Sequence, residues 1–446
     1  MSVTATPATT LLSDLAAIGG PGNIITDPPS LAAFTVDEIV PRAVVSPDSP
    51  EQVAAVLKLA HARNWVVVPA GGFTHQSTGA VPEQIDIVLR TNRLTAVEHY
   101  NAGDLMIGVG AGATLTDVER VVQAHGQMLP LDGMDPEKCT IGGAIATAAQ
   151  GTLKHAYGGL RDFCTGVRFV TADGKIAKAG ARVVKNVAGY DLMKLLIGSY
   201  GTIAVITSAS FKLFPAPRQT RTFVAQYPTL AAALEFRDMV MRSPLTPLAL
   251  EIVSPHVHAA LAGAAQVNGD WRVLLRAAGS DKVLARYRAE LAGASTREIA
   301  GDDERAMWRF YAQLPDLLTA SSQNAMLLRL DAAPQDLGKA LESAERAAVD
   351  NNFVTAAYGR VGVGALTVGF LPIAVDPPSA MQYVNAISYL RGELPRDASA
   401  IVVRCPLEAK RHFNVWGSSP NDMEAMRAIK RAFDEKDILN RGRFLF

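Results

Sequence analysis

The sequence predicts an α+β protein of two domains, and three observations carry that prediction. A strand, a helix and a second strand follow one another over residues 42–69, and the second strand runs into the pair Gly71-Gly72. Residues 71–201 hold 20 of the 36 glycines, although they make up less than a third of the 446 residues. After residue 217 strands alternate with helices and glycines are few, which predicts a largely antiparallel sheet with helices packed on it.

Composition and charge exclude several classes of protein. Hydrophobic residues make up 49% and charged residues 19%, so each domain can bury a core and the chain is not disordered. Lys+Arg and Asp+Glu both number 43 and form no long basic stripe, which argues against nucleic acid as the main ligand. Cys139, Cys164 and Cys405 stand outside any CxxC motif, so neither a disulfide framework nor an iron–sulfur cluster on this chain is expected.

The sequence also argues against a membrane span and a secretory signal. It contains no run of 18 apolar residues. Residues 1–12 lack Lys, Arg and the apolar stretch of a signal peptide. Because the cysteines suit a reducing compartment, the expected location is the cytoplasm.

The first elements have clear local signals. Residues 1–35 read as a lead-in with one short helix over 11–18. A strand over 42–45 is followed by Ser49 as a helix N-cap, Pro50 at the first helical position and Gln52 at the capping-box position. The helix should run to residue 63, and residues 65–69 form a strand of buried type.

The rest of the first domain, 36–217, mixes strands with short helices. Asp191 is expected to cap the helix that begins at residue 192. A hairpin turns at Asp173-Gly174. The expected strands are 85–89, 105–109, 167–171, 175–178 and 203–214, and the expected helices are 115–125 and 192–197.

Pro215-Ala216-Pro217 marks the best domain boundary in the chain. Residues 218–400 should form the second domain, and residues 401–446 a C-terminal segment with a helix over 422–433. The strands expected in these two regions are 222–226, 249–253, 272–277, 326–329, 353–358, 365–370 and 401–404. The expected helices are 230–241, 282–291, 303–317, 337–349 and 380–394.

Three glycine-rich segments suggest a long, flat ligand. A strand that ends in Gly71-Gly72 exposes backbone N–H groups that can converge on an anion such as a pyrophosphate, with Thr74 and Ser77 as further donors. Phe73 stands where GxGxxG requires glycine, so a Rossmann site is disfavoured. The other segments are 140–144 and 198–202. Ordinary glycine turns, and tight packing of helices on strands, remain open as alternatives.

These segments resemble the PCMH-type FAD-binding domain of the vanillyl-alcohol oxidase superfamily. That domain consists of a βαβ subdomain and a subdomain with a mixed or antiparallel sheet, and the following α+β domain forms a cap of antiparallel sheet and helices. The closer resemblance is to the FAD-binding E subunit of bacterial glycolate oxidase (dehydrogenase). The resemblance to the superfamily rests on 41–45, 53–56, 69–74, 140–144, 161–162 and 198–206. The closer resemblance rests on 126–130, 161–163, 185–192, 198–201 and Leu439-Asn440-Arg441-Gly442-Arg443-Phe444. Arg441 departs from the family's Pro.

The resemblance implies where FAD lies. The first loop would hold the pyrophosphate, 140–144 would follow the ribityl chain and diphosphate, and Gly201 and Ile206 would lie by the adenine. Gly151 and Tyr157 would lie closer to the isoalloxazine, and Asn440 and Arg443 would return to the flavin from the C-terminal segment. The implied cofactor-binding residues are Ala70, Gly71, Gly72, Phe73, Thr74, His75, Gln76, Gly79, Asp132, Gly133, Thr140, Gly142, Gly143, Ala144, Gly151, Tyr157, Gly201, Ile206, Asn440 and Arg443.

Covalent attachment of the FAD is not expected. Members of the superfamily that bond FAD through this loop carry His as the third residue of Gly-Gly-His, whereas this chain carries Phe73 there. His75 comes two residues later, a displacement of about 7 Å along an extended chain. The interpretation is non-covalent FAD with His75 as a hydrogen-bonded loop residue.

No catalytic residue or metal site is identified. The 2-hydroxy acid dehydrogenases of the superfamily carry a histidine-rich metal motif in the substrate domain, and beyond residue 155 this chain has only His256, His258 and His412. His256 and His258 read as surface residues, and His412 as either a loop or a flavin-facing residue. Tyr190 and Lys185 could form a catalytic pair, but a turn over the cofactor at Lys185-Asn186 and a helix cap at Asp191 explain this segment better. Arg161-Asp162 reads as a structural ion pair or turn contact, with a role near the flavin left open.

The resemblance implies a function. The chain is expected to be the FAD-binding subunit of a complex that oxidises a small 2-hydroxy acid such as glycolate. A second flavin subunit and an iron–sulfur subunit would be its partners, and a peripheral position at the inner membrane would come through a partner. A flavin can accept a hydride and pass single electrons onward. The alternatives are a stand-alone FAD-dependent oxidoreductase of an alcohol or 2-hydroxy acid, and an accessory subunit that uses FAD structurally.

Overall fold

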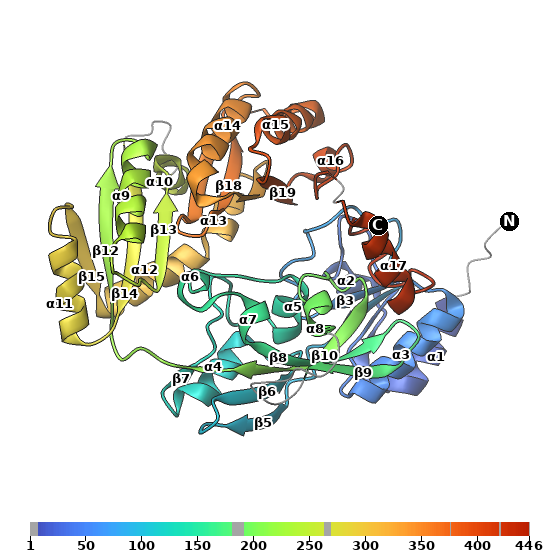
Figure 1. The fold of residues 1–446 in the computed structure, drawn as a ribbon. Helices are drawn as coiled ribbons and strands as arrows, with labels where there is room; N and C mark the ends of the chain where they lie inside the picture. The colour runs from blue at the N-terminus through green and yellow to red at the C-terminus, as the bar shows by residue number, and fades with distance from the viewer. Residues whose placement is uncertain (1–7, 181–190, 263–268, 375, 419–420, 446) are drawn as a thin grey trace.

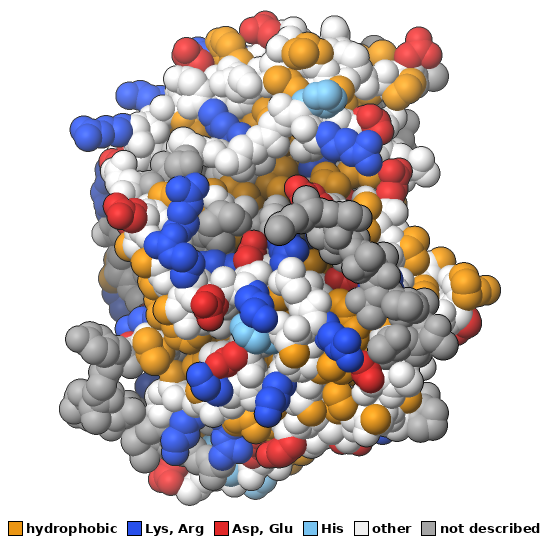
Figure 2. Space-filling view, turned by 90° about the vertical axis from the view of Figure 1, so that its right-hand side faces the viewer, with side chains coloured by type: hydrophobic (Ala, Val, Ile, Leu, Met, Phe, Trp, Pro, Cys, Tyr) orange, Lys and Arg blue, Asp and Glu red, His pale blue; other side chains and the backbone are white. Residues whose placement is uncertain are grey.

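The computed structural model describes residues 8–180, 191–262, 269–374, 376–418 and 421–445. The first half of the chain forms the lower body in Figure 1, and an eight-stranded sheet with its helices forms the upper one. Acidic and basic side chains are interspersed on the face that Figure 2 turns toward the viewer. No helix in the described part of the chain has the length and hydropathy of a membrane span.

A four-stranded sheet begins the first body and contains the predicted strand–helix–strand unit. Ser49 accepts a hydrogen bond from the Gln52 N–H at 3.3 Å, and the Gln52 side chain accepts one from the Asp48 N–H at 3.1 Å, so the helix begins as predicted. Asn64 ends it in the left-handed conformation, with φ of 56°. The sheet order is β1 (Ile24–Ile25), β2 (Ala43–Val45), β4 (Ile87–Arg90), β3 (Val67–Ala70), and the last three are parallel; the helices are α1 (Ala8–Gly19), α2 (Pro28–Ala32) and α3 (Pro50–Arg63).

A five-stranded antiparallel sheet completes the first body and contains the predicted hairpin. Its order is β5 (Val97–Asn101), β6 (Met106–Gly110), β10 (Ala204–Lys212), β8 (Cys164–Thr171), β9 (Ile176–Gly180). Strand β5 was not predicted, because its side chains are mostly exposed and polar and show no apolar alternation. The remaining elements are α4 (Leu115–Gln123), β7 (Gln127–Met128), α5 (Ile141–Ala146), α6 (Lys154–Tyr157), α7 (Leu160–Phe163), α8 (Met193–Leu196) and β11 (Phe214–Pro215).

The upper body is one antiparallel sheet with helices on both faces, which we call the cap. Its order is β15 (Thr296–Ala300), β12 (Thr220–Tyr227), β14 (Trp271–Ala278), β13 (Ala249–Val253), β17 (Phe353–Arg360), β18 (Ala365–Pro372), β16 (Met326–Asp331), β19 (Ser399–Arg404). Its helices are α9 (Leu230–Arg242), α10 (Pro255–Ala262), α11 (Asp281–Glu290), α12 (Gly301–Ala312), α13 (Leu314–Ser321), α14 (Leu337–Val349) and α15 (Ala380–Glu393). The predicted α+β architecture with an antiparallel cap sheet is confirmed.

The two faces of the cap sheet bury different side chains. Alternation along β13 sends Leu250 and Ile252 into a core with helices α9, α11, α14 and α15. Ala249 and Val253 face the opposite way and pack with α10, α12 and α13. Glu251 lies between them on that second face, where it is 1% exposed.

Two predicted helices differ from the structure. The single helix expected over 303–317 is two helices that join at Gln313, because Pro315 lacks an N–H and fits the first turn of a new helix rather than a helix interior. The prediction that Asp191 caps the next helix was wrong. Helix α8 begins after Leu192 without a side-chain cap, and the Asp191 carboxylate instead pairs with Lys194 at 3.0 Å.

The C-terminal segment returns to the first body. After helices α16 (Leu407–Lys410) and α17 (Met423–Phe433), the chain runs beside β3. The Val67 N–H donates to the Ile438 carbonyl at 2.8 Å, and the Asn440 N–H donates to the Val67 carbonyl at 2.9 Å. Figure 1 shows α17 next to the N-terminal elements. Residues 438–440 therefore cover the edge of the four-stranded sheet at the strand that leads into Gly71.

Candidate functional site

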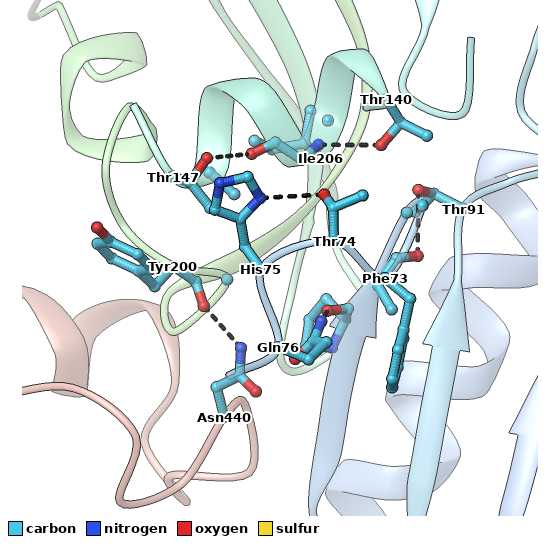
Figure 3. Close-up of a pocket in the computed structure, with 18 of the residues that line it drawn as sticks. Phe73, Thr74, His75, Gln76, Thr91, Thr140, Thr147, Tyr200, Ile206 and Asn440 are labelled. Atoms are coloured by element: carbon cyan, nitrogen blue, oxygen red, sulfur yellow. Dashed lines mark hydrogen bonds between the residues drawn. The ribbon is translucent and has the colours of Figure 1, made fainter. Parts of the chain in front are cut away.

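A pocket opens where β3 ends, between the glycine-rich segments and the C-terminal segment (Figure 3). Four stretches far apart in sequence build it: 69–78, 140–147, 200–206 and 440–443, with Thr91 and Trp416 beside them. The structure thus brings together all three glycine segments that the sequence singled out.

Most of the implied cofactor-binding residues line this pocket. They are Ala70, Gly71, Gly72, Phe73, Thr74, His75, Gln76, Thr140, Gly142, Gly143, Gly201, Ile206, Asn440 and Arg443. The lining also includes residues that sequence reasoning did not select, namely Pro69, Thr78, Thr91, Ala146, Thr147, Tyr200, Ala204, Val205 and Trp416. Tyr200 stood inside a motif already noticed, whereas Trp416 arrives from beyond the cap and has no local signal.

The first glycine loop offers backbone N–H donors to a ligand. Among the residues that the structure describes, none accepts a hydrogen bond from the backbone N–H groups of residues 71–77. Its side chains bond within the loop: the Thr74 hydroxyl lies 3.0 Å from His75 Nδ1, and the Gln76 amide donates to the Pro69 carbonyl at 3.3 Å. Unpaired backbone N–H groups of this kind are ligands for an anion.

The glycines of the loop are required by packing between the segments. A Cβ on Gly71 would lie 1.9 Å from the Thr140 hydroxyl oxygen. A Cβ on Gly72 would lie 1.7 Å from the Lys138 carbonyl oxygen, and one on Gly142 would lie 2.9 Å from the Ala111 side chain. The alternative explanation of tight packing therefore holds at these positions, and it brings the first and second segments into direct contact.

Phe73 and His75 differ in their surroundings. Phe73 has φ of 62°, and its ring packs edge-on against Phe34 at 5.6 Å, pointing away from Thr147 and Tyr200 (Figure 3). His75 lines the pocket, and desolvation there lowers its pKa, with a further lowering by the nearby Arg404. Its ring lies beside the Thr74 hydroxyl, to which it can donate or from which it can accept a hydrogen bond.

Asn440 carries an unused acceptor into the pocket. Its amide nitrogen donates to the Tyr200 carbonyl at 2.6 Å, and its backbone holds φ of 46°. Its carbonyl oxygen Oδ1 is buried and has no hydrogen-bond partner among the described residues. Tyr200 in turn stacks on Phe444 at 5.6 Å and meets Trp416 edge-on at 4.7 Å, so aromatic rings fix this side of the pocket.

These features fit FAD. Free N–H groups at the first loop suit the diphosphate, the apolar stretch 204–206 suits a flat ring, and the orphan Asn440 oxygen suits a ligand that donates a hydrogen bond. Arg443 is the one Lys or Arg in the described lining. Backbone and packing, rather than a lysine cluster, therefore make up the site.

Six implied residues lie outside this lining. Ala144 is buried in α5, and Tyr157 meets Phe214 edge-on at 4.9 Å. Gly79 lies against the Arg443 carbonyl. Asp132, Gly133 and Gly151 form a contact of their own.

The segment around Gly151 contacts both Asp132-Gly133 of the first body and Arg360 of the cap. A Cβ on Gly133 would lie 2.7 Å from the Gly151 Cα, and the Asp132 carboxylate accepts from the Leu153 N–H at 3.0 Å. Desolvation raises the pKa of Asp132, while its hydrogen bonds from Thr152 and Leu153 oppose that rise. Arg360 of the cap donates to the Gln150 carbonyl at 2.6 Å. Cap strand β17 is thereby bonded to the segment that the resemblance places near the isoalloxazine.

A buried carboxyl group lies next to this contact and was missed by sequence reasoning. Glu251 stands opposite Arg360 in the register of β13 and β17 and accepts a hydrogen bond from the Tyr311 hydroxyl at 2.5 Å. Its Oε1 has no partner among the described residues, and burial raises the pKa of Glu251 to about 8. The signal available was one carboxylate inside an otherwise apolar strand.

Glu251→Gln should remove a pH dependence of stability. The folded-state pKa of about 8 lies above the unfolded value near 4.5, so the native state binds more protons between these pH values. The free energy of unfolding of the wild type should therefore fall as pH rises through this window. We expect E251Q to lack this fall and to exceed the wild type in stability at pH 9, as measured by urea unfolding at pH 6 and 9. The exposed Glu137→Gln is the control, and an unchanged pH dependence in E251Q would contradict the assignment.

The remaining candidates that the structure describes form no reactive cluster. The structure shows no group of three or more His, Cys, Asp or Glu side chains that could hold a metal ion within the ranges it describes. His258 contacts Arg272, and His412 is exposed outside the pocket lining. The Asp162 carboxylate accepts from the Gly159 N–H at 2.7 Å, a turn contact as expected. Lys185 and Tyr190 lie outside the described residues.

Two family descriptions match the chain. "FAD binding domain" matches residues 41–180, and "FAD linked oxidases, C-terminal domain" matches residues 216–389 and 408–444. Among solved structures, p-cresol methylhydroxylase with bound substrate is similar over 99% of this chain and 97% of its own, with a TM-score of 0.78 and 16% identity. Alkyldihydroxyacetonephosphate synthase is similar over 100% and 87%, with a TM-score of 0.74 and 17% identity. At this identity the likeness concerns the fold.

Curated relatives are oxidoreductases. The D-lactate dehydrogenase of Archaeoglobus fulgidus is 38% identical over 51% of this chain and 52% of its own length. The glycolate oxidase subunit GlcD of Bacillus subtilis is 30% identical over 48% of this chain and 46% of its own. In both cases the match spans about half of the relative. The D-2-hydroxyglutarate dehydrogenase of Xanthomonas citri pv. viticola is 29% identical over 90% of this chain and 89% of its own.

Proposed function

Because the chain is a PCMH-type FAD-binding oxidoreductase of the FAD-linked oxidases, we propose that it is the flavin subunit of a complex that oxidises a small 2-hydroxy acid such as glycolate. The observation that carries the proposal is the pocket itself: all three glycine segments line it, and the N–H groups of residues 71–77 in the first loop have no acceptor among the residues that the structure describes. FAD, when bound, can accept a hydride from the substrate and pass single electrons on.

The substrate class is supported by the relatives and by charge. Lactate, 2-hydroxyglutarate and glycolate, which appear in the names of the relatives, are all 2-hydroxy acids. Three cap arginines lie near the first body: Arg360 bonds the Gln150 carbonyl, while Arg329 and Arg404 lie close enough to Tyr200 and His75 to affect their pKa values. Arg329 also pairs with Asp331, and Arg404 with Asp316. Guanidinium groups suit a carboxylate substrate at the seam between the cap and the first body.

An electron acceptor on a partner is part of the proposal. The chain has three cysteines, fewer than the four thiolates that hold a [2Fe–2S] or [4Fe–4S] cluster. We therefore assign the clusters to an iron–sulfur subunit, with a second flavin subunit beside this chain. The location proposed for the complex is the cytoplasm, or the inner membrane surface through a partner.

A second candidate is a stand-alone dehydrogenase of a 2-hydroxy acid. It is favoured by the D-2-hydroxyglutarate dehydrogenase of Xanthomonas citri, which aligns with 90% of this chain, cap included. The third candidate is an accessory subunit in which FAD has only a structural role.

Flavin bleaching separates the three candidates. The complex is isolated through a tag on this chain, and the chain is also purified alone; both receive glycolate or D-lactate without oxygen while the flavin absorbance is recorded. We expect bleaching in the complex and fast reoxidation only when the iron–sulfur subunit is present. Full turnover by the chain alone with a soluble acceptor would instead establish the stand-alone enzyme. Bleaching in neither preparation contradicts the substrate class, and a chain purified without flavin contradicts the whole proposal.

The FAD is proposed to be non-covalent. Phe73 offers no atom that could bond to the flavin, and its ring is packed on Phe34. We expect acid precipitation to release all of the flavin from the wild type and from His75→Ala, as measured by absorbance of the supernatant. A fluorescent band at the mass of the chain on a denaturing gel, lost in H75A, would contradict this and identify His75 as the attachment point.

A further inference from the structure

The Arg443 guanidinium is engaged with the carbonyl side of the first glycine loop. It donates to the carbonyl oxygens of Gln76, Thr78 and Ala80, the last two at 2.6 and 3.1 Å. The residue is 4% exposed, so these bonds are shielded from water. Each fixes the direction of one peptide group of the loop.

The main chain of Arg443 is held by the same loop. Its carbonyl oxygen accepts from the Ala80 N–H at 3.0 Å and from the Trp416 indole N–H at 3.0 Å. Gly79 permits this approach, because a Cβ there would lie 2.6 Å from that oxygen. Gly79 and Arg443, both implied as cofactor-binding residues, therefore contact each other where the loop packs on the C-terminal segment.

A second buried cation and one carboxylate complete the cluster. Asp37 Oδ2 accepts from Arg443 at 2.7 Å and from Lys410 at 2.6 Å, and Lys410 also donates to the Ser77 carbonyl at 2.9 Å. The Lys410 and Arg443 side chains are 3% and 5% exposed, and Asp37 is 11% exposed. Two cations share one carboxylate, so a positive charge is left over behind the loop.

The number of N–H donors on Arg443 decides whether its side chain can bind a phosphate directly or can only position the loop. Its terminal nitrogens carry four N–H groups, and these meet four acceptors: Asp37 and the Ala80 carbonyl from Nη1, the Gln76 and Thr78 carbonyls from Nη2. The fork that would grip a phosphate is therefore occupied. Arg443 can act on an anion in the pocket only through the loop and through its charge.

We propose that Arg443 is a positioning residue for the FAD diphosphate. It holds the carbonyl groups of Gln76, Thr78 and Ala80 and so anchors the C-terminal end of the loop whose residues 71–77 carry the free N–H groups, while Asp37, itself bonded to Lys410, fixes the Arg443 guanidinium in place. The excess buried charge adds long-range attraction for the diphosphate in a medium of low dielectric. The proposal rests on the proposed FAD site and assigns a role within it.

The test is Arg443→Lys, which keeps the charge and removes the fork. FAD is titrated into apoprotein and followed by flavin fluorescence, and we expect the dissociation constant to rise about 10-fold to 100-fold, the usual effect of losing a partner that orients direct ligands. At saturating FAD the ³¹P resonances of the bound diphosphate should shift, and amide exchange of residues 71–77 in the apoprotein should accelerate. Arg441→Lys, which changes a tail arginine bonded to the Asp437 carbonyl outside the pocket lining, is the matched control.

A second variant keeps the test decisive if R443K does not fold. Asp37→Asn preserves shape and removes the charge that anchors Arg443, so it should weaken FAD binding and shift the same ³¹P resonances. Wild-type affinity and unchanged ³¹P resonances in R443K or D37N overturn the proposal. Equal losses in R441K would also overturn it, since they would mark a general weakening of the tail. A wild-type apoprotein that binds no FAD overturns the proposed function as well.

Discussion

Gly72→Ala should strongly weaken FAD binding. The added Cβ would lie 1.7 Å from the Lys138 carbonyl oxygen and 2.8 Å from its carbonyl carbon, distances at which one main-chain segment must move. Either the first loop, which carries the proposed diphosphate donors, moves out of the pocket, or the segment before Thr140 moves and displaces Thr140 and Gly142 of the pocket lining. Overpacking of this kind costs about 1–3 kcal/mol in stability, and displaced donors should weaken FAD binding by about 100-fold or more.

The measurement is flavin content after purification, followed by FAD titration of the apoprotein. Gly22→Ala is the matched control, because it adds the same methyl group where no atom lies within 4 Å. We expect G22A to carry FAD like the wild type. A G72A protein that keeps full flavin and wild-type affinity would show that the contact with Lys138 relaxes at no cost, and would remove packing as the reason for this glycine.

Lys430→Met should be the most destabilising change in the C-terminal segment. Lys430 is 6% exposed and donates to the carbonyls of Thr202 and Leu439 at 2.7 and 3.0 Å and to the Asp434 carboxylate at 2.6 Å. Asp434, itself 1% exposed, also accepts from the N–H groups of residues 438 and 439. Removing the cation leaves a buried carboxylate without its charge partner, which costs about 3–5 kcal/mol.

Urea unfolding monitored by circular dichroism measures this loss. Lys436→Met is the control, because Lys436 is an exposed lysine of the same segment that makes one bond, to the His61 carbonyl at 2.9 Å. We expect a change of less than about 1 kcal/mol there. A K430M protein as stable as K436M would contradict the assignment of Lys430 as the anchor of the segment.

Local chemistry explains what the sequence predicted well. The helix after Ser49 begins at the predicted residue because capping depends on neighbours three positions apart, which sequence displays directly. The hairpin at Asp173-Gly174 is equally local. The glycine segments were recognisable because each is short and rich in residues with special backbone demands.

Contacts between distant residues explain what was missed. Trp416 lines the pocket because the fold returns the chain to it more than 200 residues after Ile206, and Thr91 does so because β4 pairs with β3; no local pattern marks either of them. Glu251 acquires its raised pKa from burial beneath Tyr311, sixty positions along the chain. The break between two helices at Gln313 was missed for a different reason. It has a local signal, because Pro315 stands in the sequence and indicates a helix start.

The strand-like run of residues 438–440 beside β3 also has a consequence for biosynthesis. A ribosome makes β3 and the first glycine loop early, then the whole cap, and only afterwards the segment that contains Asn440 and Arg443. Domains usually fold as they emerge, N-terminal parts first. Here the nascent first body must wait, with one sheet edge uncovered and the loop unfixed, until the cap has been made. The cofactor site is therefore completed after release of its final segment, and chaperone protection of that open edge would matter most during this interval.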